Sequence, residues 1–152
     1  MAQNATPAFT KNAIVPAPVP LLLANTKSDG TGNLTSSVTI YKLLTADATN
    51  GAFLDYVRFM LTASVASTSS TATLARLYLS SITTGATTSA DTFLFAEIAL
   101  PVTIGDSPTI AQNPIDWPCQ FRIPAGYTIL CSIHAAPAAN TAWIATAYAG
   151  DY

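Results

Sequence analysis

The side chains that could support nucleophilic or metal chemistry are few in this sequence. It contains one histidine, His134, and two cysteines, Cys119 and Cys131. A Cys–His nucleophile needs its thiol and imidazole within hydrogen-bond reach. His134 and Cys131 are three residues apart in a segment that alternates like a β-strand, which places them on opposite faces. We therefore expect no nucleophilic pair and predict that His134 lies at the surface or an interface, near a loop.

Two carboxylates, Asp55 and Glu97, lie within predicted strands and could approach each other across a sheet. Paired carboxylates in a cleft with sugar-stacking aromatic residues are the arrangement of a glycosidase. The simpler alternative is that each pairs with a strand arginine, such as Arg58 or Arg76, and we favour it. The sequence also lacks the ligand spacings of zinc and calcium sites. We expect no catalytic residue, no metal and no cofactor.

The composition is unusual in its scarcity of charge. Of the 152 residues, 50 % are hydrophobic and only 9 % are charged, with a formal net charge of −2. The basic residues are dispersed, whereas nucleic-acid binding needs a clustered basic face. No apolar run approaches the roughly 20 residues of a spanning helix, and the first residues lack the pattern of an export signal. We expect neither a nucleic-acid nor a membrane partner, and a surface suited to packing against other proteins.

Strand signals dominate the chain, and no window of a dozen residues has helical periodicity. Short runs of β-branched and aromatic residues alternate with Gly, Pro, Asn and Ser/Thr turns. This pattern predicts an all-β fold, an antiparallel β-sandwich that is jelly-roll-like, with about eight strands. The predicted strands are residues 21–24, 36–44, 53–62, 72–79, 92–100, 119–123, 127–134 and 141–149.

A hairpin is predicted around Pro124, Ala125 and Gly126, because a three-residue loop ending in glycine is a common connection between paired strands. In that register Cys119 lies opposite Cys131. A cross-strand Cβ separation of about 4.5–5.5 Å is slightly long for a disulfide. We expect two reduced, packed thiols, with a strained disulfide as the alternative.

The N-terminal residues 1–18 are punctuated by proline, which favours extended backbone and removes ladder donors. We predict an extended arm over residues 1–18 and a β-sandwich domain over residues 19–152. Trp117 lies in a Pro-flanked segment, where an exposed aromatic ring would serve an interface. The candidate interface residues are Pro7, Phe9, Pro16, Pro18 and Trp117.

Several strand segments together resemble the small jelly-roll virion proteins of tailed bacteriophages, in particular head decoration (cement) proteins. The segments are residues 50–59, 75–79, 121–130 and 142–152, the last ending in Ala149-Gly150-Asp151-Tyr152. The resemblance covers residues 35–152 and rests on ordinary strand motifs, with no catalytic signature. It implies a structural protein on the capsid surface of a virion, made in the host cytoplasm. The implied partners are the major capsid protein and further copies of the chain in a homotrimer that binds between capsomers.

Two other functions stay open. One is a tail, neck or fibre-anchoring component of a virion. The other is a carbohydrate- or receptor-binding jelly roll, which would need exposed aromatic rings and carboxylates gathered on one face. Tyr56, Tyr78 and Trp117 are the conceivable members of such a face.

Overall fold

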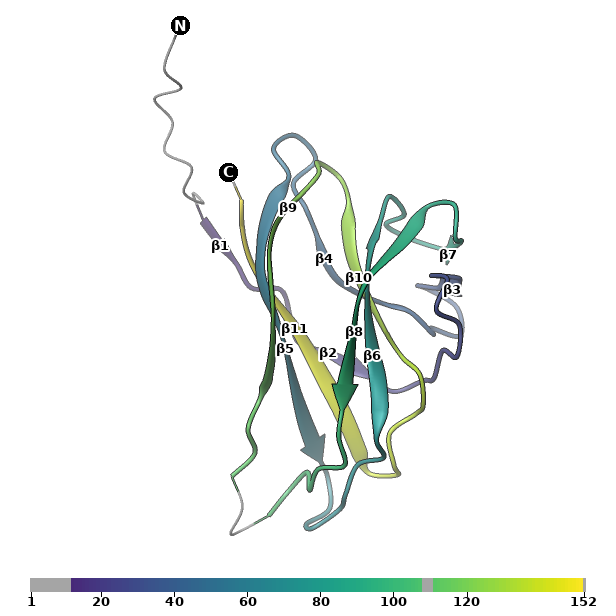
Figure 1. The fold of residues 1–152 in the computed structure, drawn as a ribbon, viewed down its shortest axis with the longest axis vertical. Helices are drawn as coiled ribbons and strands as arrows, with labels where there is room; N and C mark the ends of the chain where they lie inside the picture. Colours follow the sequence, from purple (N-terminus) through teal and green to yellow (C-terminus); the bar gives the residue numbers. More distant parts are fainter. Residues whose placement is uncertain (1–11, 108–110, 152) are drawn as a thin grey trace, which may run out of the picture.

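The computed structural model describes residues 12–107 and 111–151. Within these residues the chain is all-β, without a helix, and forms two packed antiparallel sheets (Figure 1). The first sheet has the order β1-β11-β5-β9, with β2 also paired to β11, and the second has the order β4-β10-β6-β8. Their bounds are β1 Asn12–Ile14, β2 Val19–Leu21, β4 Tyr41–Thr45, β5 Ala52–Ala63, β6 Thr73–Ser80, β8 Thr92–Leu100, β9 Ile115–Ile123, β10 Thr128–Ile133 and β11 Thr141–Asp151.

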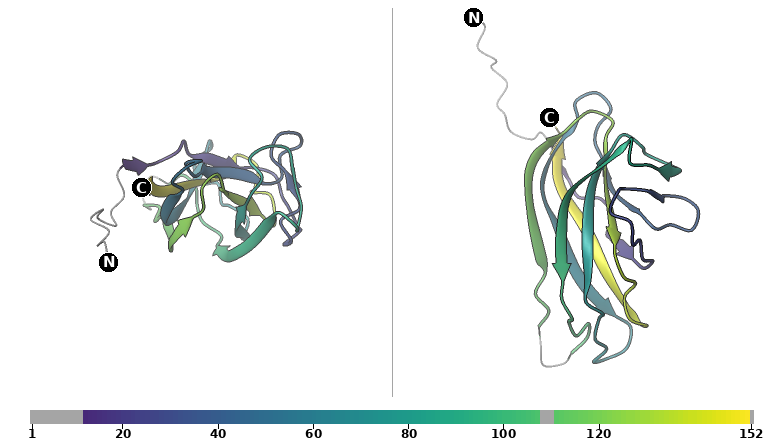
Figure 2. Two further views of the ribbon diagram at one scale, coloured as in Figure 1. Left: turned by 90° about the horizontal axis from the view of Figure 1, so that it is seen from above. Right: turned by 45° about the vertical axis from the view of Figure 1, so that its right-hand side comes forward.

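The strand order is that of a jelly roll. β1 and β2 lie one after the other along β11 and act as one interrupted strand, which gives two sheets of four. Every connection crosses from one sheet to the other, except the one between β6 and β8, which are neighbours. The predicted β-sandwich is therefore confirmed, with the jelly-roll order added by long-range pairing that no local pattern specifies. Figure 2 shows the two layers from above and after a turn of 45° about the vertical axis of Figure 1.

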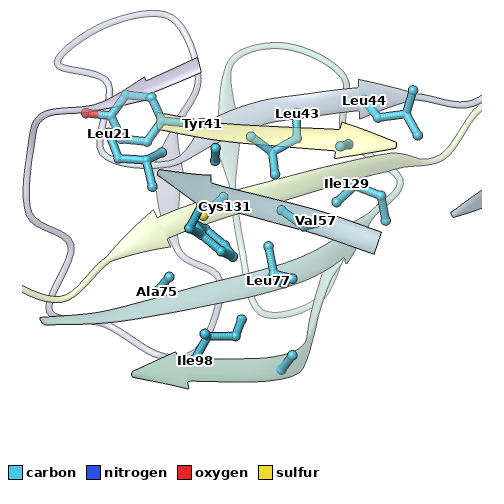
Figure 3. Close-up of a cluster of buried hydrophobic side chains, with 14 of the residues drawn as sticks. Leu21, Tyr41, Leu43, Leu44, Val57, Ala75, Leu77, Ile98, Ile129 and Cys131 are labelled. Carbon is cyan, nitrogen blue, oxygen red and sulfur yellow. The ribbon is translucent and has the colours of Figure 1, made fainter. Parts of the chain in front are cut away.

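The space between the sheets is filled by the inward faces of the strands. On β6, Ala75 and Leu77 are fully buried in this core, as the predicted alternation required. Leu43 and Cys131 reach the same core from β4 and β10 (Figure 3). Because apolar side chains from both layers interdigitate here, the core supplies the main driving force for folding.

β-Bulges, among them one in β5 and one in β8, change which side chains face the core. Strict alternation in residues 53–62 predicts that Asp55 and Val57 share a face. The register instead shifts between Leu54 and Tyr56, so that Leu54 and Val57 are both fully buried and Asp55 is exposed. A second shift lets Phe95 skip pairing with β6. A bulge inserts one residue and reverses the parity that follows, which is why these faces were predicted wrongly.

A second, smaller cluster covers the outer face of the β4-β10-β6-β8 sheet. Tyr78, Ile40 and Leu130 are fully buried there, with Leu34 and Leu94 packed against them. The cover comes from residues 22–40 and from the short pair β3 (Gly32–Asn33) and β7 (Ala86–Thr87), which lie on the right in Figure 1. The part of this face around Tyr78 is therefore apolar and buried although it lies outside the sandwich.

Part of the predicted N-terminal arm belongs to the first sheet. Of the predicted arm, Asn12–Ile14 pairs with the end of β11 as strand β1. Pro16 and Pro18 lie in the stretch between β1 and β2, where the ladder is interrupted. Pro7 and Phe9 lie outside the described residues.

The predicted hairpin at Pro124–Gly126 is wrong. β9 pairs with β5 in one sheet, and β10 pairs with β4 and β6 in the other, so the turn carries the chain between sheets. Gly126 adopts a positive φ of 75°, and the amide of Tyr127 donates to the carbonyl of Pro124. The glycine signal correctly marked a turn, but a local turn does not decide whether its flanking strands pair.

Candidate interaction surface

An apolar groove lies between β8 and β9, the strands that end the two sheets on the same side of the sandwich. It has a volume of about 440 Å³, and none of its lining side chains is charged. Four of the seven lining residues are aromatic, and mostly apolar walls of this kind are typical of binding sites. The lining residues are Leu79, Phe93, Phe95, Trp117, Pro118, Cys119 and Phe121.

The groove lies where the two edge strands are not bridged by a further described strand. Phe95 on β8 and Phe121 on β9 join the sheets at its base, with ring centroids 5.1 Å apart and planes at 79°. Phe93 lies opposite Leu79, on the face of the sheet that points to the core, yet it is 68 % exposed. A core-facing aromatic side chain with this exposure indicates a surface that lacks its cover.

The opposite open side of the sandwich is covered by the chain itself. There β4 ends one sheet, and residues 12–21 end the other. Ile14 and Val19 pack against the core, and Leu21 is fully buried. The Tyr41 hydroxyl accepts hydrogen bonds from the amides of Leu22 and Leu23, at 3.0 and 2.7 Å. An uncharged extended segment thus seals one side, while no described segment seals the groove side.

Trp117 is the predicted interface residue that the structure places in the groove. It lies on β9 opposite Val57 and is 37 % exposed. Pro16 lies away from it, in a hollow between the N-terminal segment and β4, and Pro18 is exposed. The structure does not bring these prolines and Trp117 together. Phe93, Phe95 and Phe121 were not among the predicted interface residues, although two phenylalanines at positions i and i+2 of the predicted strand 92–100 were a usable signal.

Both cysteines are free thiols, and neither is activated. Burial raises the pKa of Cys119, on the groove wall, to about 11. Burial also raises the pKa of Cys131, which is fully buried in the core, far above its usual value. The two lie on strands of different sheets, so the predicted cross-strand relation is wrong, while the expected packed thiols are observed. A thiol with a raised pKa is a poor nucleophile.

The expected ion pairs form, but with one change of partner. Arg76 donates to Glu97 across β6 and β8 with an Nε–Oε1 distance of 2.7 Å. Arg58 pairs with Asp116 on β9 instead of Asp55. Asp55 and Glu97 lie in different sheets, so the conceivable catalytic pair does not exist.

Arg76 is the centre of a polar cluster on the outer face of its sheet. Its side chain is only 7 % exposed, and Nη1 donates to the carbonyls of Asn25 and Lys27, both at 3.1 Å. Nη2 lies 3.2 Å from Nδ1 of His134. His134 is exposed just after β10, as predicted. The cluster ties residues 25–27 to the sheet, so its charged groups already have structural partners.

A second cluster lies on the outer face of the other sheet. The rings of Tyr56 and Tyr148 stack with centroids 4.4 Å apart, and the Arg58 guanidinium lies over both, at 5.6 and 5.5 Å. Arg58 also holds the Asp116 carboxylate through Nε and Nη2, at 2.7 and 2.8 Å, which lowers the pKa of Asp116. Two rings and a carboxylate therefore share one exposed face, whereas Tyr78 is fully buried.

Among residues 12–107 and 111–151, no group of three or more His, Cys, Asp or Glu side chains could hold a metal ion. The same residues contain no helix long and apolar enough to cross a membrane. Comparisons of the chain with protein-family models, with curated proteins and with solved structures find no match.

Proposed function

We propose that this protein is a structural subunit of a tailed-phage virion, which decorates and stabilises the capsid by binding between capsomers as a trimer. The observation that carries the proposal is the aromatic groove between β8 and β9, with Phe93 exposed on a core-facing position. Soluble monomers seldom leave such surfaces uncovered. The major capsid protein and further copies of the chain are the proposed partners.

The scarcity of charge supports the same proposal. Only 9 % of the residues are charged, and several of these charges are paired within the subunit, as in Arg58–Asp116 and Arg76–Glu97. When large parts of a subunit's surface are buried, each unpaired charge there adds a free-energy cost of desolvation. A subunit with few unpaired charges therefore has a small cost. The dispersed basic residues argue against nucleic acid as the partner.

The test is the position of the protein in purified particles. Heads and tails are separated, each fraction is analysed by mass spectrometry, and intact particles are reconstructed by electron microscopy. We expect the chain in the head fraction and its density on the outer head surface. Recovery only with tails would overturn capsid decoration in favour of a tail, neck or fibre-anchoring role.

A carbohydrate-binding function is the second candidate, and one observation favours it. Tyr56, Tyr148, Arg58 and Asp116 gather on one exposed sheet face, which is the combination that sugar binding requires. A glycan array with the wild-type protein and the Tyr148→Ala variant tests it. Strong, selective binding that the variant loses would favour this function; uniformly weak signals would exclude it.

A further inference from the structure

We infer that the groove between β8 and β9 is a self-association surface. It receives the exposed Phe93 side chain of a second copy of this chain. The inference deepens the proposed function, on which it rests for its role in assembly. It names the surface through which copies would meet. The inference is carried by the groove, its chemistry and its place at two free strand edges.

The first argument is that the surface is complementary to itself. Each copy offers an aromatic side chain, Phe93, that is 68 % exposed, and beside it a groove lined by Phe95, Trp117 and Phe121. A surface that carries both a projecting ring and an apolar hollow can receive the same surface of another copy. Aromatic anchors in desolvated pockets are the residues that contribute most to the affinity of protein interfaces.

The second argument is charge. None of the residues that line the groove carries a charge, so no like charges meet inside it when two copies approach; the exposed Asp55 carboxylate lies near Cys119 but outside the lining. The nearest charged side chain in sequence to Phe93 is Asp91, whose carboxylate already accepts hydrogen bonds from Thr88 and Thr92. A charged partner would find no complementary group in the groove, whereas an uncharged copy of the same surface matches it.

The third argument is the backbone. β8 and β9 each end their sheet on this side, so their outer edges are unpaired among the described residues. A free edge of nine residues, as in β8, is a template for pairing with another strand. The other open side of the same sandwich is sealed by an uncharged extended segment, residues 12–21, which pairs with β11 and packs on the core. A second copy supplies the equivalent cover on the groove side.

The test measures the mass of the free full-length protein by sedimentation velocity and native mass spectrometry across a dilution series. The variant is Phe93→Ser. The control is Val102→Ser, because Val102 is 63 % exposed and lies outside the groove. We expect the wild type and Val102→Ser to form the same oligomer. Phe93→Ser is expected to raise the dissociation constant about 30-fold or more, the effect of losing an interface anchor.

A second readout is the rate at which Cys119, on the groove wall, reacts with an alkylating reagent. If copies cover the groove, alkylation of Cys119 is faster in Phe93→Ser than in the wild type at the same protein concentration. Unchanged urea midpoints would establish that Phe93→Ser is folded.

A wild type that stays monomeric at about 100 μM would overturn the inference, since that affinity is too weak to hold copies together. Equal association of Phe93→Ser and the wild type would also overturn it. Neither result bears on the position of the protein in particles, which tests the proposed function separately.

Discussion

The rings of Phe95 and Phe121 meet edge to face across the groove side of the jelly roll, with centroids 5.1 Å apart and planes at 79°. Each ring comes from an edge strand of a different sheet, β8 and β9. The contact therefore fixes the separation of the two sheets on the side that no segment of residues 12–107 or 111–151 covers. Phe95 can reach Phe121 because the bulge in β8 removes it from the ladder with β6.

We predict that this pair is coupled in stability. Phe95→Ala and Phe121→Ala should each lower the free energy of unfolding by about 2–3 kcal/mol, below the cost for a fully buried ring because both are half-buried. The double variant should lose about 1 kcal/mol less than the sum, which is the usual worth of an edge-to-face contact. Urea titrations of the four proteins measure both quantities. Strict additivity would contradict a direct contact between the rings.

A second prediction concerns Gly51, in the turn between β4 and β5. Gly51 and Gly85 both have positive φ, 78° and 82°, so alanine is strained at either. A methyl group on Gly51 would also collide with the carbonyl oxygen of Ile123, whereas Gly85 has open space around it. We expect Gly85→Ala to cost about 1 kcal/mol and Gly51→Ala at least about 2 kcal/mol. Equal shifts of the urea midpoint would show that packing at the turn is looser than described.

The local elements were predictable from the sequence, and their pairing was not. The predicted strands at residues 53–62, 72–79 and 92–100 match β5, β6 and β8 within a residue or two, because alternation and turn residues are local signals. The predicted pairing of Cys119 with Cys131 failed because the connection crosses between sheets, and crossing depends on the whole topology.

The candidate site shows the same limit. Trp117 was predicted as an interface residue from its flanking prolines, and it lines the groove. Phe95 packs against the core beside Ala96, contrary to strict alternation, because a bulge interrupts β8 there and has no signature in this sequence. The partners of Arg76 in residues 25–27 come from a loop about 50 positions away. Such contacts are set by the folded arrangement of distant segments.

The third prediction is that Arg76 anchors the cover of its sheet. Arg76→Met removes the Nη1 donor from the carbonyls of Asn25 and Lys27, of which the second still accepts from the Tyr78 hydroxyl, and leaves the Glu97 carboxylate without its partner. We expect a loss of about 3 kcal/mol, because the buried Asn25 carbonyl and the Lys27 carbonyl lose hydrogen bonds to a charged donor. Glu97→Gln should cost about 1 kcal/mol or less, since the Glu97 side chain is 45 % exposed.

Hydrogen exchange gives this prediction a local readout. The amide of Asn25 donates to the carbonyl of Ile133 at 2.7 Å, and this bond holds the cover to β10. In Arg76→Met the Asn25 amide should exchange faster relative to core amides such as that of Leu77. Uniform acceleration over the whole chain would mean that Arg76 stabilises the fold globally and does not anchor residues 25–27 in particular.

The fourth prediction is a loss of stability in alkaline solution that depends on Cys131. Burial raises the pKa of the Cys131 thiol well above its usual value, whereas in the unfolded chain the pKa of a thiol is about 8.5. Above that pH the unfolded chain releases a proton that the folded chain retains, so the free energy of unfolding falls as the pH rises. Between pH 8 and pH 10 this one group should lower the free energy of unfolding of the wild type by about 2 kcal/mol.

Cys131→Val keeps an apolar side chain of similar size but has no thiol to ionise. Over the same pH interval its free energy of unfolding should fall by about 2 kcal/mol less than that of the wild type. Urea titrations of both proteins at the two pH values provide the comparison, in which the lysines and tyrosines they share cancel. Equal losses would mean that the thiol ionises in the folded protein, and that water reaches the core between β4, β6 and β10.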